Sequence, residues 1–354
     1  MSSKHKTARI GLGSFDLLKG LGVILFIFSH TYTRYDCSQS VVLSGLQLIL
    51  LLGGVGARTA FYVISGITFR ETTPAKMLKK TFRSLMIPYF WVAAAYGLLF
   101  PLVRYPFMPY WREVFMYAIR YVAAFLLGNI EYGKVIFGFE IYWCTPMYFF
   151  LSMFIALNLL NLILKFKNSK IRLLLVCLCV VVGNILLSRK MLLFSLAYGL
   201  PAVGFCYTGY LLNKNPTFWN LQNNPKFYLL AIPVYLLGIC LNMIENPGFF
   251  INTAIWALTI YAAILMLFCS NYVSGKDWKG FGWLKIIGVY SYWIICIHSF
   301  ETEAIPWFMF VQAFSDHQLL AFVLETAIKT VIITSGCLLL KKVIKWKYRR
   351  RGTK

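Results

Sequence analysis

Three ionisable side chains, Asp16, Lys19 and His30, interrupt the first apolar segment of the sequence, and His30 lies near its far end. At about 100° per residue, the eleven residues from Lys19 to His30 turn a helix through three circuits and roughly 20°, so the two side chains share one face. Asp16 lies about 60° from Lys19 on the same helix. Ionisable groups in a membrane helix are costly unless they face protein, water or substrate. The spacing therefore predicts that this stripe carries the function.

The two ends of the stripe suit different chemical tasks. Histidine is the side chain best suited to take a proton from a hydroxyl near neutral pH, which makes His30 the candidate catalytic base. Lys19 suits an anion near the cytoplasmic surface, with Asp16 balancing or positioning its charge. The rise from Lys19 to His30 is roughly 16 Å, so a long substrate held at Lys19 would place its reactive end at His30. The alternatives are that Lys19 only extends to the membrane interface and that His30 is a polar core residue.

A cluster of basic residues follows the second apolar segment. Five basic residues lie between positions 70 and 83, which is more than membrane orientation requires. Four of them share one helical face, at Lys76, Lys79, Lys80 and Arg83. We interpret this face as a phosphate-binding patch beside the Lys19 end of the stripe, because several charge-assisted hydrogen bonds can converge there. The alternative is that the charge only orients the chain in the membrane.

Arg58 lies within the second apolar segment, in the run GGVGARTAFYVISG from Gly53 to Gly66. An arginine inside a span is a functional hypothesis by default. The glycines of this run permit close helix contact, as small residues do in membranes. Arg58 falls in the outer half of the segment, where it can face the same cavity as His30. The alternative is that its side chain extends outward to the interface.

Acidic residues and a second histidine gather at the ends of later apolar segments. Glu140 precedes the run IYWCTPMYFF, His298 closes the run YSYWIICIHSF, and Glu301 and Glu303 follow it. We expect all of them at the extracytoplasmic surface, where they can orient a sugar hydroxyl or His30. For at least one of the glutamates, simple surface solvation is the competing interpretation.

The elements that must position these residues are membrane helices. Of the 354 residues, 59% are hydrophobic and 13% are charged, and the mean hydropathy is +0.68. Soluble domains carry about 25% charged residues. The apolar runs are continuous and about twenty residues long, as spanning helices require. The composition therefore predicts an all-α, polytopic integral membrane protein.

We expect ten membrane spans, with both termini in the cytoplasm. They cover residues 14–32, 45–69, 84–103, 141–164, 172–188, 192–212, 227–243, 251–270, 285–300 and 319–340. In this arrangement 25 of the 35 basic residues fall in cytoplasmic connections or termini and 7 fall outside. Cytoplasmic loops carry an excess of Lys and Arg, so the asymmetry fixes the orientation.

The rest of the chain fits one membrane domain over residues 1–354. Residues 104–140 form an extracytoplasmic excursion in this scheme, lying in the interface or re-entrant, because counting 114–128 as a span would invert every later loop. The basic tail 341–354 is interpreted as a cytoplasmic anchor at the lipid surface. The net charge of +23 is concentrated between the apolar runs, which argues against a nucleic-acid partner. No internal repeat is evident, which disfavours the common transporter folds.

The cysteines and the first apolar run bear on processing and metal binding. Eight of the nine cysteines fall in apolar segments, and only Cys37 sits in a polar connection. No cysteine has metal-ligand spacing to a histidine, so we interpret them as small apolar packing residues and expect no metal site. The first run lacks a small-residue cleavage site and carries charges, so we expect no cleavable signal peptide.

The ordered motifs together resemble the acyltransferase-3 family of membrane-bound O-acyltransferases, which modify bacterial surface glycans. That family has an Asp, a basic residue, ten intervening residues and a His in its first span, matched here by Asp16, Lys19 and His30. Further matches lie in later segments: FYVISG at Phe61–Gly66, KKTFRSLMIPY at Lys79–Tyr89 with its basic pair Lys80 and Arg83, Trp143 with Pro146, and the Ser-aromatic run Ser291–His298.

The resemblance implies an acyl-CoA co-substrate bound from the cytoplasm and an acceptor hydroxyl that approaches from outside. It implies His30 as the catalytic histidine, with Lys19, Lys80 and Arg83 near the CoA phosphates. Two features depart from the family pattern. Lys19 replaces the commoner Arg, which keeps the charge but loses the bidentate fork. A Trp-Ser-Leu…Glu motif of some members is absent at the fourth span, which leaves the role of Glu140 open.

We therefore expect a multi-pass O-acyltransferase of a bacterial cell membrane that moves an acyl group, acetyl being the family's commonest, to an envelope carbohydrate or glycolipid. His30 and Asp16 are assigned to catalysis, and Arg58 to stabilising the oxyanion. The other candidate residues are Lys19, Lys79, Lys80 and Arg83 for the acyl-CoA, and Glu140, Trp143, His298 and Glu301 for the acceptor. An acyl-histidine intermediate stays open. The rival function is export of a glycan or its lipid-linked precursor; a sensor would leave the buried charges unexplained.

Overall fold

The computed structural model describes residues 12–35, 41–108, 110–131, 133–136, 138–191, 193–242, 244, 247–275 and 279–351. These residues are almost entirely helical. The helices are α1 Leu12–Tyr32, α2 Val41–Ile67, α3 Pro74–Thr81, α4 Ile87–Leu98, α5 Phe100–Arg104, α6 Trp111–Leu127, α7 Tyr148–Ile163, α8 Ser169–Ser188, α9 Leu196–Lys214, α10 Pro225–Leu229, α11 Ala231–Asn242, α12 Phe249–Gly275, α13 Gly282–Ala304, α14 Trp307–Ala313 and α15 Gln318–Arg351. Strands β1 Lys134–Ile136 and β2 Phe139–Ile141 pair as one antiparallel hairpin.

The helical membrane class is supported by the length and apolar character of these helices. Among the described residues, five helices are long and apolar enough to cross a membrane, namely α1, α8, α12, α13 and the segment Ser315–Leu339 that contains most of α15. A sixth is reached if Pro74–Leu98 and Phe100–Phe107, bent by 44° to each other, form one span. Each of the ten expected spans overlaps a helix, but the number ten and the cytoplasmic placement of the termini stay predictions.

The structure differs most from the expected spans at two boundaries. The span expected from residue 141 begins only at Tyr148 in α7, because Ile141 pairs in the hairpin and a short 3₁₀ turn containing Pro146 precedes the helix. The last helix continues past residue 340 to Arg351, so most of the predicted basic tail extends it. The first eleven residues, Cys37 and residues 352–354 lie outside the described residues.

The segment 104–140 folds as α6 followed by the hairpin. Ala118, Tyr121 and Phe125 are buried on one face of α6, which packs against α4. The helix also exposes large apolar side chains, including Trp111 and Phe115. α6 is not among the candidate spans of the described residues. Its location outside the membrane stays a prediction, as does a re-entrant path.

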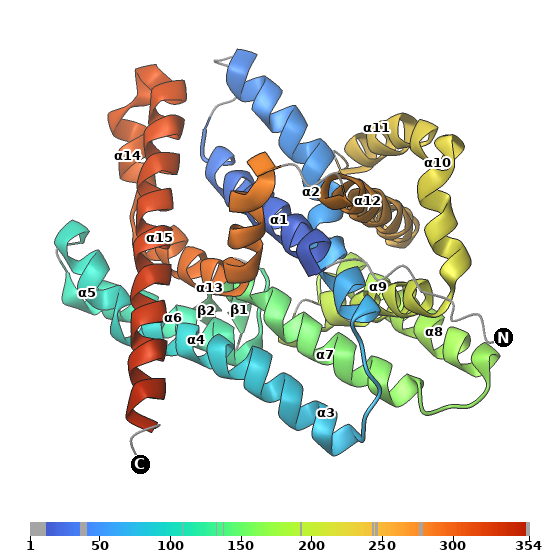
Figure 1. Ribbon diagram of the computed structural model, residues 1–354. Helices are drawn as coiled ribbons and strands as arrows, with labels where there is room; N and C mark the ends of the chain where they lie inside the picture. The colour runs from blue at the N-terminus through green and yellow to red at the C-terminus, as the bar shows by residue number, and fades with distance from the viewer. Residues whose placement is uncertain are drawn as a thin grey trace.

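α1 lies at the centre of the fold, packed against α2, α12 and α13 (Figure 1). The contact of α1 with α13 is one of backbones: a Cβ on Gly288 would lie 1.7 Å from the main-chain oxygen of Asp16, and a Cβ on Gly20 would lie 2.0 Å from that of Leu284. Small residues permit this approach in membrane helices. The predicted close contact of the Gly53–Gly66 run is confirmed at Gly66, where a Cβ would lie 1.9 Å from the main-chain oxygen of Cys206 in α9.

Candidate active site

Two histidines from different helices meet at the end of α1. The ring centroids of His30 and His298, the latter from α13, are 5.8 Å apart. Phe26 packs edge-on against both rings, at 4.6 Å from His30 and 5.6 Å from His298. The Trp143 ring lies 6.2 Å from that of His30. His30 and Trp143 remain partly exposed while His298 is 0% exposed.

His298 is held by an acid from its own helix. Its Nδ1 lies 2.7 Å from Oε1 of Glu301, three residues further along α13, so the two side chains share a helical face. The Nε1 of Trp307, at the start of α14, donates to Oε2 of the same glutamate at 2.9 Å. A carboxylate only accepts hydrogen bonds, so Nδ1 of His298 carries a proton. Glu301 therefore fixes the orientation of the His298 ring.

A second acid, Glu325 of α15, gathers three donors beside the histidines. It accepts from Arg34 Nη1 at 3.0 Å, from the Tyr35 hydroxyl at 2.6 Å and from Lys329 Nζ at 2.7 Å. Lys329 also donates to the hydroxyl of Thr31 at 3.1 Å. Glu325 and Lys329 are both 0% exposed. α15 is thus tied to the end of α1 that carries His30.

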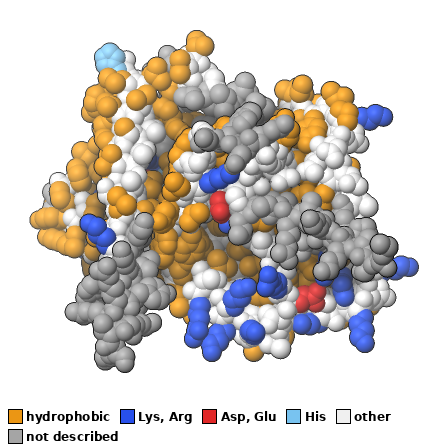
Figure 2. All heavy atoms as spheres, in the orientation of Figure 1, with side chains coloured by type: hydrophobic (Ala, Val, Ile, Leu, Met, Phe, Trp, Pro, Cys, Tyr) orange, Lys and Arg blue, Asp and Glu red, His pale blue; other side chains and the backbone are white. Residues whose placement is uncertain are grey.

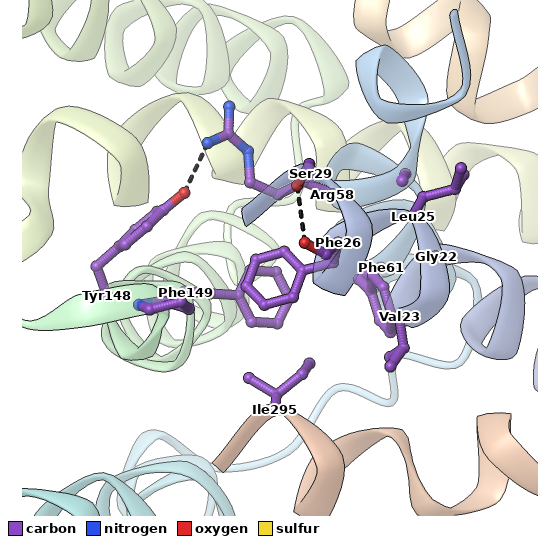
Figure 3. Close-up of a pocket in the computed structure, with 12 residues that line it drawn as sticks. Gly22, Val23, Leu25, Phe26, Ser29, Arg58, Phe61, Tyr148, Phe149 and Ile295 are labelled. Atoms are coloured by element: carbon purple, nitrogen blue, oxygen red, sulfur yellow. Dashed lines mark hydrogen bonds between the residues drawn. The ribbon is translucent and has the colours of Figure 1, made fainter. Parts of the chain in front are cut away.

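An apolar cavity of about 80 Å³ lies between α1, α2, α7 and α13, and Phe26 is one of the residues that line it (Figure 3). Its walls include Phe61, Phe149 and Ile295. Arg58 lines it from α2, and its Nη1 donates to the Tyr148 hydroxyl at 2.8 Å. In Figure 3 the Arg58 guanidinium and Ile295 stand at opposite ends of the group. The cavity therefore has a cationic end and an apolar end.

The predicted basic patch lines a shared depression near the start of α4. Lys76, Lys79, Lys80 and Arg83 surround an open hollow of about 480 Å³, and Figure 2 shows Lys and Arg side chains gathered over α3 and the α7–α8 connection. The residues Phe82–Met86 form a π-helical turn between α3 and α4, a feature common at functional sites. Four like charges around one hollow favour an anionic ligand.

Lys19 and Asp16 lie near the other end of α1 from His30. Lys19 Nζ is 3.6 Å from Oδ1 of Asp16, and both side chains are partly exposed. The sequence predicted that the basic patch lies beside Lys19, but Lys19 is not among the described residues that line the hollow.

Glu140 belongs to a different part of the surface. It forms an ion pair with Arg120 of α6 at 2.8 Å, and Arg120 also donates to the Tyr142 hydroxyl at 3.1 Å. Glu303 likewise accepts from the Tyr121 hydroxyl at 2.6 Å. Both acids thus brace α6 against its neighbours. The contacts of these two glutamates involve neither histidine.

The structure brings together four of the predicted residues: His30, Trp143, His298 and Glu301. Sequence reasoning missed the cluster of Arg34, Glu325, Lys329 and Trp307 beside them. A signal was present, because Glu325 and Lys329 lie four residues apart in an otherwise apolar segment. Opposite charges at that spacing pair on one helix face.

One comparison with known proteins gives a match that spans most of the chain. A family model described as an acyltransferase domain, that of the acyltransferase-3 family, matches residues 12–342. No curated protein and no solved structure matches the chain. The matched region contains every residue of the histidine site and the basic hollow. The chain belongs to the acyltransferase-3 family.

Proposed function

We propose that this acyltransferase moves an acyl group from acyl-CoA to a hydroxyl of a cell-envelope carbohydrate or glycolipid, in the cell membrane of a bacterium. The observation that supports this best is the accessible His30 paired with a buried, acid-oriented His298. A partly exposed histidine at the end of a membrane helix can meet an acceptor hydroxyl. The neighbouring cavity can hold the group to be transferred.

His30 acts as the general base in this proposal. Its ring nitrogen takes the proton of the acceptor hydroxyl as the oxygen attacks the thioester carbonyl. The tetrahedral intermediate then collapses, the carbon–sulfur bond breaks, and the thiolate of CoA leaves and is protonated. Arg58, at the cationic end of the cavity, is the candidate for stabilising the oxyanion. Transfer through an acyl-histidine would use the same residue as nucleophile.

The cavity limits the size of the acyl group. An engineered apolar cavity of about 150 Å³ holds benzene, which has six heavy atoms. On that scale the 80 Å³ here suits about three heavy atoms, the number in an acetyl group. Phe61, Phe149 and Ile295 offer it an apolar wall. Acetyl-CoA is therefore the proposed donor.

The donor and the acceptor are proposed to arrive from opposite ends of α1. Lys79, Lys80 and Arg83 in the basic hollow bind the CoA phosphates. Lys19 is proposed to attract the same phosphates, with Asp16 balancing its charge. Trp143 beside His30 offers an aromatic face to the sugar. His298 and Glu301 are 0% and 2% exposed, so we now assign them to orienting His30 rather than to direct substrate contact.

The test is the acyl content of the surface glycans. Mass spectrometry should find that a deletion strain lacks an acyl modification, that the wild-type gene restores it and that His30→Ala does not. Export of the unmodified glycan should stay normal in both strains. Loss of export in the His30→Ala strain would favour the rival transporter function, and an unchanged acyl content in the deletion strain would refute the proposal.

A further inference from the structure

A fully buried ion pair in α15 takes no part in the chemical steps above. Glu325 and Lys329 are both 0% exposed, and their Oε1 and Nζ atoms are 2.7 Å apart. A buried ion pair is costly because both charges lose their hydration, and it often adds nothing to stability. Two charges kept at this depth therefore require an explanation other than holding the helices together.

Glu325, the carboxylate of this pair, is connected to His30 through Arg34. Arg34 Nη1, held by Glu325, donates at 3.0 Å to the main-chain oxygen of His30, and its Nη2 donates at 3.3 Å to that of Thr302. These carbonyls lie in the last turns of α1 and α13, where main-chain oxygens lack helical partners and carry partial negative charge. One guanidinium thus fixes the ends of the two helices that carry the histidines.

Lys329, the cation of the pair, is connected to His298 through Trp307. Lys329 Nζ lies 5.0 Å from the centre of the Trp307 ring, within the range of a cation–π interaction. The Nε1 of Trp307 donates to Glu301, which holds His298. Contacts therefore run in a closed ring from His30 through Arg34, Glu325, Lys329, Trp307, Glu301 and His298 back to His30.

Lys329 has no spare donor for a substrate. An ammonium group has three N–H donors. Here it faces the carboxylate of Glu325, the hydroxyl of Thr31 and the ring of Trp307. Its burial also prevents contact with acyl-CoA or acceptor. Any effect of Lys329 on the reaction must act through the groups it holds.

We propose that Glu325 and Lys329 of α15 are positioning residues that set His30 against His298 for acyl transfer. This inference rests on the proposed function of His30. It makes the last long helix a part of the active site, although α15 contributes no group that touches the substrate. A misplacement of reacting groups by about 1 Å can cost about 100-fold in rate. A small shift of the histidines, caused by breaking this ring of contacts, would therefore lower kcat.

The experiment replaces the pair by apolar residues of similar length. The double variant Glu325→Met/Lys329→Met removes both charges together, so no single charge of the pair is left buried alone. Purified in lipid nanodiscs, it should melt within a few degrees of the wild type and keep the KM for acetyl-CoA. Its kcat should fall at least tenfold. Thr330→Met, an exposed position on the same helix, is the matched control and should keep wild-type kcat.

A merely structural role gives a different result. If the double variant keeps both the wild-type kcat and the wild-type stability, the positioning role is wrong. Tyr35→Phe is the second variant, in case the double variant does not fold. It removes one hydrogen bond to Glu325 and should lower kcat about fivefold with KM unchanged; an unchanged kcat contradicts the proposal.

His30→Ala is measured in the same assay to separate this inference from the function on which it rests. Full activity in His30→Ala refutes the proposed function itself. Loss of activity in His30→Ala with full activity in both Glu325→Met/Lys329→Met and Tyr35→Phe refutes only the positioning role. The expected result is a lowered kcat in all three variants, with the KM for acetyl-CoA preserved in Glu325→Met/Lys329→Met and in Tyr35→Phe.

Discussion

Enlarging the apolar end of the cavity should change which acyl groups the enzyme accepts. Ile295 lines the cavity from α13, opposite Arg58. The substitution Ile295→Ala removes three carbons from this wall, so it opens room for about two methylene groups of a longer acyl chain. The wild-type cavity suits an acetyl group. Butyryl-CoA carries two further carbons that have no space there.

The size of the effect follows from the value of a methylene in a tight pocket. One extra methylene is worth about 1–3 kcal/mol in a hydrophobic site. Two of them predict that the wild type prefers acetyl-CoA to butyryl-CoA by about 30-fold or more in kcat/KM. In Ile295→Ala this preference should fall by at least about tenfold, because the added carbons now occupy the vacated volume.

The neighbouring residue provides a matched control. Ile294 and Ile295 are both 7% exposed, but Ile294 does not line the cavity. Either change to Ala is expected to lower the free energy of unfolding by about 2–5 kcal/mol. The assay is therefore the ratio of kcat/KM for the two donors in one preparation, which cancels the amount of folded enzyme. An unchanged ratio in Ile295→Ala, or an equal change in Ile294→Ala, would refute the acyl assignment of the cavity.

Two further predictions concern the donor site and the helix contact. The double change Lys80→Gln/Arg83→Gln should raise the KM for acetyl-CoA about tenfold, with kcat within twofold of wild type, because it removes two phosphate-binding charges. The control Lys170→Gln, which removes an exposed charge on α8, should leave both KM and kcat unchanged. A lowered kcat with a normal KM would contradict phosphate binding in the hollow. Gly288→Ala places a Cβ 1.7 Å from a main-chain oxygen of α1 and should yield no folded protein by size-exclusion chromatography. Gly97→Ala meets its nearest side-chain atom at 3.4 Å and should fold, and equal yields of the two would contradict the observed packing of α1 on α13.

Much of the site was predictable because membrane helices make polar residues conspicuous. His30 was predicted from the helix face that it shares with Lys19, and Trp143 and His298 were predicted from motifs in later apolar segments. The structure places all three within one cluster. The predicted basic face also lines one hollow. Helical periodicity alone decides which residues of one segment share a face.

What could not be predicted depends on which helices meet. Glu140 looked equivalent to Glu301 because both follow or precede apolar runs. In the fold Glu140 binds Arg120, while Glu301 lies beside His298 because the two are three residues apart on α13. The role of Glu325 was hidden because its partner Arg34 is 291 residues away in the chain. Neither the Glu140–Arg120 pair nor the Glu325–Arg34 pair follows from spacing along the sequence.

The central claim is that His30 takes the proton of the acceptor hydroxyl. The most direct measurement is the rate of transfer of a labelled acetyl group from acetyl-CoA to isolated envelope glycan by purified wild type and His30→Ala in nanodiscs. Loss of a general base typically costs 100-fold to 10,000-fold in rate. The account predicts a fall of about this size with the KM for acetyl-CoA preserved. A His30→Ala variant that transfers the label at a rate within a fewfold of wild type would contradict it.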